Sequence, residues 1–384
     1  MARVTSEALS GVAGQDVTGA LAAATFRFRT DAPELARYAR AHLATLVTKA
    51  GGPVRICSTL RWHEGQPPRD RTGAFPELAS MERIDRDLYI APGRLCWFRI
   101  DDLRDLHLYL SWREDRLTVE GDFYYRLASD WYRDRAKRVL YPRRVGELRR
   151  RRFTTLLYYL VYYPCWWWLE ETQDLHPIHA AGVRTSRSGI LLGGASGVGK
   201  STLAVALASL PGAKLLSDSF VLHNGADMFA VPEPILLDAW SRQWLGSKGD
   251  ELEAIDWRYC LNRTGYRLPT FRLAADGRAG LLLFPRRSPE TYVKPISSEQ
   301  AHERLSAADL IINDLRRYWA FAAVVEHLVP GRLVARREAQ LARLTAAVPG
   351  YEIGLKADAT CTATVGSILE LVADQQLRTA NARQ

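Results

Sequence analysis

The sequence predicts an α/β protein of two domains: an amino-terminal α+β domain built on an antiparallel sheet, then an α/β domain organised around a glycine-rich loop. The chain has 384 residues, and domains usually contain roughly 100 to 200. Short runs rich in β-branched and aromatic residues, separated by turn residues, fill positions 54–123. An apolar run, a glycine-rich loop and a helix-forming run follow one another at 189–210.

We expect residues 1–23 to be a disordered lead-in, residues 24–142 the α+β domain and residues 143–384 the second domain. The first 23 residues are rich in Ala, Gly, Ser and Thr, and they lack the basic start and uninterrupted apolar run of a signal peptide. The five cysteines are widely spaced and form no C-x-x-C pair, which indicates reduced thiols and a cytoplasmic protein.

The composition and charge are those of a globular protein with one basic segment. Hydrophobic residues make up 47% and charged residues 25%, which argues against disorder throughout and against a polytopic membrane protein. Ten basic and two acidic residues lie within 133–152, so this segment carries +8 of the net +9. Because a nucleic-acid-binding protein would usually spread its basic face more widely, no nucleic-acid partner is expected.

In the first domain the pattern predicts one helix and a series of strands. Residues 33–49 have helical spacing of their apolar side chains, and the Gly-Gly-Pro sequence at 51–53 ends the helix. Predicted strands cover 24–30, 54–62, 87–91, 94–100, 106–112 and 117–123. Residues 64–72 are expected to be a loop. Since no catalytic cluster is apparent here, the domain is expected to serve recognition or scaffolding.

Residues 153–169, FTTLLYYLVYYPCWWWL, carry no charge and directly follow the basic segment. A helix of this length would span about 25 Å, less than the hydrocarbon core, and Pro164 interrupts it. We favour a core helix packed behind the sheet of the second domain. The alternative is an in-plane helix, with residues 133–169 in peripheral contact with anionic headgroups at the inner face of the membrane.

Residues 194–201 match the pattern G-x-x-x-x-G-K-[ST] at every fixed position, which identifies a P-loop. Glycines allow backbone N–H groups to point inward at a polyphosphate. Lys200 is expected to contact the β- and γ-phosphates, and Ser201 to contact Mg²⁺. The predicted cofactors are therefore ATP and Mg²⁺. The expected binding residues are Gly194, Ala195, Ser196, Gly197, Val198, Gly199, Lys200, Ser201 and Thr202.

Asp218 follows the run KLLS, one helix after the P-loop, so its carboxylate is expected beside the phosphates. There it would act as the general base for an acceptor hydroxyl, as a Mg²⁺ ligand, or only as a turn residue. Further on, residues 232–271 mix tryptophans with arginines and are predicted to form an acceptor-side lid or an aromatic packing cluster. Helices are expected over 299–328, 333–348 and 362–377, with a strand at 351–355.

The segments HPIHAAGV, GGASGVGKST and KLLSDSFVL together resemble the catalytic domain of HPr kinase and its relatives. The resemblance covers roughly residues 178–371 and continues through 281–285, Arg286 and Arg287, and weakly through 349–355. It implies an HPr-kinase-like P-loop fold, with His179, Lys200 and Asp218 as catalytic residues. His179 would contact a phosphate or carboxylate, or would be a packed strand histidine.

The resemblance implies a kinase that transfers the γ-phosphate of ATP to a serine of a protein or peptide, as in the divergent relatives that modify peptide precursors. A first alternative is a kinase of a lipid or small-molecule alcohol at the membrane surface. A second is a nucleotide-gated NTPase or binding module.

Overall fold

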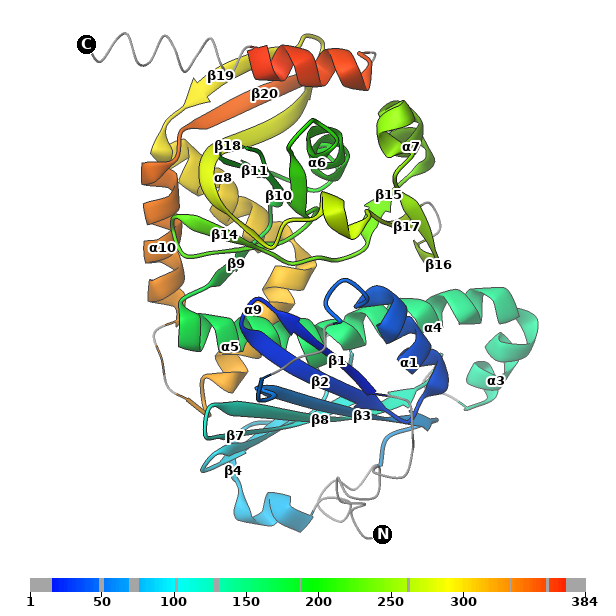
Figure 1. The fold of residues 1–384 in the computed structure, drawn as a ribbon. Coiled ribbons are helices and arrows are strands. Elements are labelled where there is room, and N and C mark those ends of the chain that lie inside the picture. The colour runs from blue at the N-terminus through cyan, green and yellow to red at the C-terminus, as the bar shows by residue number, and fades with distance from the viewer. Residues whose placement is uncertain are drawn as a thin grey trace. The chain divides into compact units, whose positions relative to one another are not determined.

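The computed structural model describes residues 16–47, 52–68, 76–100, 103–127, 131–186, 188–260, 263–329, 331, 333–356 and 359–370. The chain forms two compact units of mixed α/β structure (Figure 1). Unit 1 contains Met1–Thr172 and Tyr318–Gly331, and unit 2 contains Gln173–Arg317 and Arg332–Gln384. This division falls between Thr172 and Gln173, whereas the expected boundary was at residue 142; the helices between these positions belong to unit 1.

Unit 1 is built on an eight-stranded sheet in the order β1-β2-β3-β8-β7-β6-β5-β4. Its strands are β1 (Asp16–Leu21), β2 (Ala24–Thr30), β3 (Ile56–Glu64), β4 (Glu82–Asp85), β5 (Leu88–Ala91), β6 (Arg94–Trp97), β7 (Leu106–Arg113) and β8 (Arg116–Tyr125). Its helical elements are α1 (Pro33–His42), η2 (Pro76–Ser80), α3 (Trp131–Leu140), α4 (Pro142–Leu157), the π-helical turn η3 (Tyr158–Tyr162) and α5 (Tyr163–Gln173). All six predicted strands are present.

Two expectations for unit 1 are wrong. Residues 16–21 were expected in a disordered lead-in but form β1, which pairs antiparallel with β2 so that Asp16 lies opposite Arg29 and bonds to it at 2.7 Å. The sheet is mixed rather than antiparallel, since β2 pairs with β3, and β3 with β8, in parallel. The helix α1 between β2 and β3 makes the crossover that parallel neighbours require.

The uncharged aromatic run forms the core of unit 1. Residues 156–169 are all buried, and ring contacts join Phe153 to Trp62 and Trp167 to Trp112. The run therefore packs on the sheet of unit 1, and both the expected packing behind the other sheet and the membrane-facing interpretation of 153–169 are wrong. The helix continues past Pro164 because the preceding turn η3 widens, which accommodates a residue without an N–H group.

Unit 2 contains a nine-stranded sheet in the order β12-β10-β11-β18-β14-β13-β9, with β20 on β18 and β19 on β20, and a separate sheet β15-β17-β16. Its strands are β9 (His176–Ile178), β10 (Ala181–Arg184), β11 (Gly189–Leu192), β12 (Lys214–Ser217), β13 (Val221–His223), β14 (Asp227–Ala230), β15 (Ile235–Leu237), β16 (Glu253–Cys260), β17 (Arg263–Arg267), β18 (Asp276–Ser288), β19 (Tyr292–Ile296) and β20 (Gly350–Lys356). Its helical elements are α6 (Lys200–Ala208), α7 (Ala239–Leu245), η4 (Gly246–Gly249), η5 (Thr270–Arg272), α8 (Ser298–Ile311), the first part of α9 (Asn313–Val325), α10 (Leu333–Ala347) and the helical residues 361–370.

The central strands of unit 2 are covered on both faces. Ile190 and Leu192 of β11 pack in one cluster with α6, whereas Leu191 between them packs in another with α8 and α10. Alternate residues of a strand point to opposite faces, so β11 is a fully buried strand of the kind that its continuous apolar sequence predicts. This burial fixes the end of β11, from which the glycine-rich loop starts.

Candidate active site

The glycine-rich loop runs from the end of β11 to the first residue of α6, as the sequence predicts. Gly194, Gly197 and Gly199 have φ angles of 114°, 82° and 101°. A Cβ atom added to Gly194 or Gly197 would meet nothing within 4 Å. Gly194 and Gly197 are therefore required by the left-handed backbone and not by crowding.

Lys200 lies at the start of α6 and turns back over the loop. Its ammonium donates to the carbonyl oxygens of Gly194 at 2.7 Å and Ala195 at 2.8 Å. The side chain is buried, and burial lowers the pKa of Lys200 to about 8, against the opposing effect of Asp218. A protonated amine is thus held where the loop would cradle an anion.

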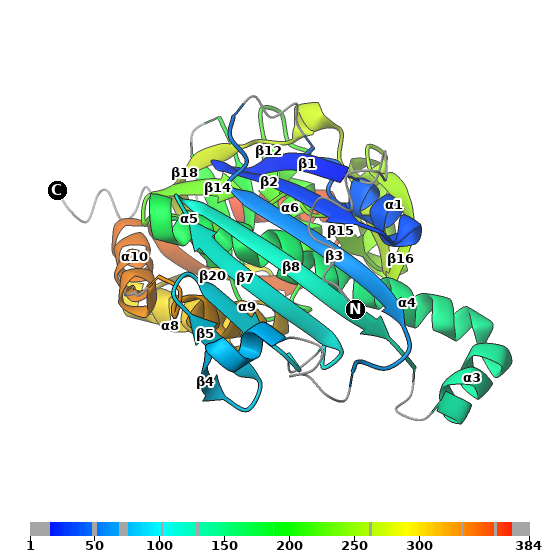
Figure 2. The ribbon, with the colours of Figure 1, turned by 90° about the horizontal axis from the view of Figure 1, so that it is seen from below.

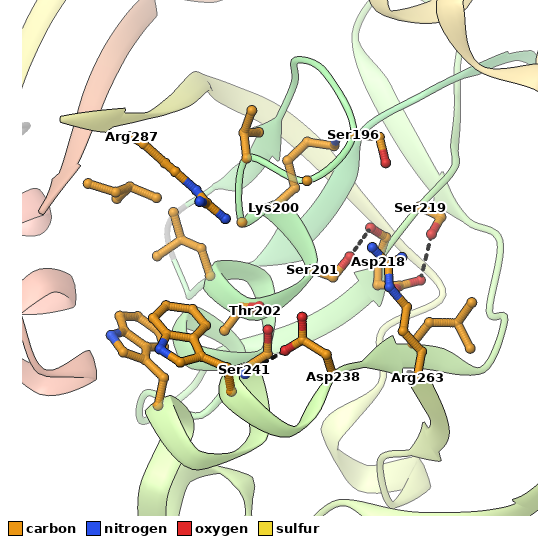
Figure 3. A pocket seen from close by; sticks show the side chains of 18 of the residues that line it. Ser196, Lys200, Ser201, Thr202, Asp218, Ser219, Asp238, Ser241, Arg263 and Arg287 are labelled. Carbon is orange, nitrogen blue, oxygen red and sulfur yellow. Dashed lines mark hydrogen bonds between the residues drawn. The ribbon is translucent and has the colours of Figure 1, made fainter. Parts of the chain in front are cut away.

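Asp218 follows β12 and faces the start of α6, as Figure 3 shows. Ser201 donates its hydroxyl to the backbone carbonyl of Asp218 at 3.4 Å, and Ser219 donates to the Asp218 carboxylate at 3.1 Å. Burial raises the pKa of Asp218 to about 6, although its hydrogen bonds and Lys200 act in the other direction. A carboxyl group with this pKa can accept a proton near neutral pH.

His179, in the turn between β9 and β10, lines the same cavity. Its backbone N–H donates to Asp309 of α8 at 2.7 Å, while its two ring nitrogens have no hydrogen-bond partner among the described residues. Burial, together with the charge of Lys200, lowers the pKa of His179 to about 3. The imidazole is therefore neutral, and it offers one donor and one acceptor to a ligand.

One cavity of about 550 Å³ in unit 2 is lined by Lys200, Ser201, Asp218 and His179. Figure 3 labels the first three of these residues. Its wall also includes Asp238, Trp240, Trp244, Arg263 and Arg287. The tryptophans and Arg263 come from the segment that was predicted to be an acceptor-side lid. The side chains of Trp257 and Arg258, from the same segment, lie outside the described residues.

Trp240 and Trp244 form an aromatic surface on α7 at one side of the cavity. Their rings are nearly parallel, with centroids 6.4 Å apart and an interplanar angle of 21°. Trp244 is fixed because its indole N–H donates to the carbonyl of Ala359 at 2.8 Å, whereas Trp240 is 57% exposed. The surface is thus rigid on one side and accessible on the other.

Arg286 and Arg287 are neighbours in β18, so their side chains point to opposite faces of the strand. Both arginines are exposed, but Arg287 lines the cavity, whereas Arg286 lies 3.5 Å from Glu352. The sequence could not tell which arginine faces the site. It also missed Asp309, whose burial raises its pKa to about 7. The signal was available, since Asp309 continues the helical spacing of buried Ala301 and Leu305.

The donor atoms near Lys200 suit a magnesium ion. Mg²⁺ prefers oxygen ligands and usually takes one or two from the protein and the rest from water and phosphate. The Ser201 hydroxyl and the Asp218 carboxylate are such oxygens, and both line the cavity. Among the described residues no cluster of three or more His, Cys, Asp or Glu could form a metal site by itself. The donor set therefore fits Mg²⁺ held jointly with a phosphate.

No protein-family model and no curated protein matches the chain. Among solved structures it is similar to the HPr(Ser) kinase/phosphatase from Coxiella burnetii, over 53% of this chain and 99% of that chain. The two chains are 12% identical and the TM-score is 0.25. A similarity this low assigns no function to the site.

Proposed function

We propose that the protein is a kinase that transfers the γ-phosphate of ATP to a serine hydroxyl of a protein or peptide, and that it is a divergent relative of HPr kinase. One observation carries the proposal: Lys200, Ser201 and Asp218 converge on one wall of a single cavity, with the Ser201 hydroxyl 3.4 Å from the Asp218 carbonyl. Phosphoryl transfer needs this combination of a phosphate cradle, hard oxygen ligands and a base.

The loop residues and Lys200 bind the polyphosphate. The ammonium exchanges its bonds to the carbonyls of Gly194 and Ala195 for bonds to phosphate oxygens, and the N-terminus of α6 adds to the positive potential. Arg263 and Arg287 bring two further positive charges to the cavity. These charges would stabilise the negative charge on the phosphoryl group as it transfers.

Asp218 acts as the base. The acceptor oxygen attacks the γ-phosphorus, the bond from that phosphorus to the bridging oxygen of ADP breaks, and the hydroxyl proton passes to the Asp218 carboxylate. A pKa of about 6 leaves the carboxylate mostly ionised at neutral pH and still basic enough to accept the proton. Bound Mg²⁺ would neutralise charge on the phosphates, with the Ser201 hydroxyl as its protein ligand.

Trp240 and Trp244 bind the adenine base by stacking. In a P-loop the backbone N–H groups hold the α- and β-phosphates and the Lys reaches the β- and γ-phosphates, so the base lies beyond the α-phosphate. Thr202 and both tryptophans line the same cavity as Lys200. An exposed indole offers a flat face to any nucleobase, so the tryptophans are assigned to the nucleotide instead of to a lid over the acceptor.

Unit 1 recognises the acceptor. Side chains of β2, β3, β7 and β8 line a groove of about 560 Å³ in this unit. The residues lining the groove include small polar side chains and two glutamates, together with the arginines Arg27, Arg29, Arg61, Arg113 and Arg116. Arg29 and Arg61 are paired with Asp16 and Asp122. The arginine excess favours an acceptor with acidic side chains near the modified serine.

The test is label transfer from γ-labelled ATP in a bacterial cell extract, separated afterwards into protein, lipid and inorganic phosphate fractions. Label in protein that depends on Lys200 and Asp218 supports the proposal. Label in the lipid fraction would assign the acceptor to a lipid alcohol. Release of free phosphate alone, unchanged by added extract, would identify an NTPase and contradict the proposal.

A further inference from the structure

Helix α3 in unit 1 directs its apolar side chains into solvent. Tyr132, Val139 and Leu140 are 76%, 72% and 66% exposed, and Tyr141, which follows the helix, is 53% exposed. Ala136, between them at helical spacing, is also exposed. These residues form one continuous stripe, which we call the α3 apolar stripe. A surface helix normally turns such a stripe toward the core.

The polar side chains of α3 hold this reversed orientation. Arg138 bonds to Asp134 at 2.6 Å and to Glu64 of β3 at 3.0 Å, and its guanidinium lies over the ring of Tyr125. Asp134 in turn accepts a hydrogen bond from the backbone N–H of Leu127. The charged face of α3 is thus attached to the sheet of unit 1, and this attachment points the apolar stripe outward.

Helix α4 repeats the arrangement. Arg149 stacks over Trp62 at 4.9 Å and pairs with Glu34 at 3.1 Å, which fixes the helix to unit 1. Leu148, next to it in the sequence, is 47% exposed. The side chains of Arg151 and Arg152 are also exposed. Figures 1 and 2 both show α3 and the adjoining end of α4 extending beyond the sheet of unit 1.

The charge around the stripe is strongly positive. Residues 133–152 contain ten basic and two acidic residues, and Arg133, Arg135 and Lys137 of α3 are exposed beside the stripe. Among the described residues, no helix has the length and apolarity to cross a bilayer. An exposed apolar stripe with tyrosines, bordered by arginines, has instead the composition of a helix that lies in the plane of an anionic membrane.

We propose that α3 and the start of α4 bind the surface of an anionic bilayer, with Tyr132, Val139, Leu140 and Tyr141 entering the headgroup region and the surrounding arginines contacting lipid phosphates. The inference does not depend on the proposed kinase activity. The membrane contact is thus assigned to the exposed residues of α3 and α4, and not to the aromatic run, whose residues 156–169 are buried.

The experiment is sedimentation of the full-length protein with vesicles of phosphatidylglycerol and phosphatidylcholine, or of phosphatidylcholine alone. We expect binding to the anionic vesicles at least tenfold tighter than to neutral ones, and loss of that preference at 500 mM salt because exposed charges are then screened. The variant Val139→Glu/Leu140→Glu should bind the anionic vesicles at least tenfold more weakly.

Leu310→Glu/Ile311→Glu is the matched control, because these side chains at the end of α8 are similarly exposed, at 59% and 66%. It should bind like the wild type, and both variants should keep the wild-type melting temperature. Absence of binding at low salt, or equal binding by Val139→Glu/Leu140→Glu, would overturn the proposal. If the wild type instead self-associates and only Val139→Glu/Leu140→Glu is monomeric, the α3 apolar stripe is a protein interface and the lipid assignment is wrong.

Discussion

The hydroxyl of Ser201 donates to the backbone carbonyl of Asp218 at 3.4 Å, although the rest of α6 and the whole of β12 lie between the two residues in the sequence. This bond joins the first turn of the helix after the loop to the residue that follows the next strand. It places a hydroxyl, a carboxylate and the Lys200 ammonium on one wall.

Lys200→Ala should reduce kcat/KM for ATP by about 10²- to 10³-fold, because it removes a buried positive charge aimed at the phosphates. The measurement is phosphoryl transfer from labelled ATP, with far-UV circular dichroism to confirm folding. Lys214→Ala, at the start of β12, is the control and should be fully active. Wild-type turnover in Lys200→Ala would exclude the loop as the donor site.

Asp218→Asn should lower turnover by about 10²- to 10⁴-fold while ATP affinity changes little, because the amide keeps the shape of the side chain but accepts no proton. A titration of Mg²⁺ separates the two roles: recovery at high Mg²⁺ identifies a metal ligand, and no recovery identifies the base. Asp227→Asn, on the exposed part of β14, is the control. Near-normal turnover of Asp218→Asn at ordinary Mg²⁺ would refute both roles.

The pH dependence of kcat/KM should be bell-shaped. The rate should rise as pH increases through about 6, where Asp218 loses its proton, and fall above about 8, where Lys200 loses its charge. The residual activity of Asp218→Asn should lack the acidic limb and keep the alkaline one. An acidic limb that persists in this variant would assign the lower pKa to another group.

Trp240→Ala should weaken ATP binding about tenfold without affecting inorganic tripolyphosphate, because only ATP has a base that can stack on the indole. Trp240→Phe keeps an aromatic face and should bind ATP nearly as well as the wild type. Competition for a fluorescent nucleotide provides both affinities. An equal loss for ATP and tripolyphosphate would place the phosphates, and not the base, beside Trp240.

Arg27→Glu/Arg113→Glu should raise KM for an acidic acceptor peptide severalfold and leave ATP affinity unchanged, because charge reversal in the groove repels the acceptor alone. Arg94→Glu, an exposed arginine of β6 outside the groove, is the control. The comparison uses initial rates at saturating ATP. Unchanged KM in the double variant would move acceptor recognition away from the groove.

The sequence predicted local patterns well and long-range pairing poorly. All six strands predicted in the first domain are present, because alternation and turn residues are local signals. The sheet was expected to be antiparallel, but β3 runs parallel to both of its neighbours. The direction of pairing depends on contacts between strands that are far apart in the sequence, so it has no local signal. In the site, Lys200 and Asp218 were predictable from a loop pattern and its position in the chain order. Asp309 was missed because its hydrogen bond from the His179 backbone joins residues 130 positions apart, although the helical spacing that buries Asp309 was visible in the sequence.

The orientation of α3 could not be predicted either, because the same apolar spacing normally marks a buried face. The ion pair from Arg138 to Glu64 reverses it, and that pair joins residues far apart in the sequence. Likewise, the aromatic run was correctly predicted to be a core helix, but it was predicted to pack on the wrong sheet. A uniformly apolar segment contains no information about which of two sheets it covers.

The division of the chain also has a consequence for the order of synthesis. Tyr318 and Phe321 of α9 belong to unit 1, where their rings contact Tyr163, and Tyr318 also contacts Trp166. The ribosome therefore synthesises the entire glycine-rich loop and α6 before it synthesises the residues that complete the aromatic core of unit 1. The first segment of unit 2, Gln173–Arg317, lies in the sequence between the two segments of unit 1, so a fragment that ends at Thr172 would expose rings that the full chain buries.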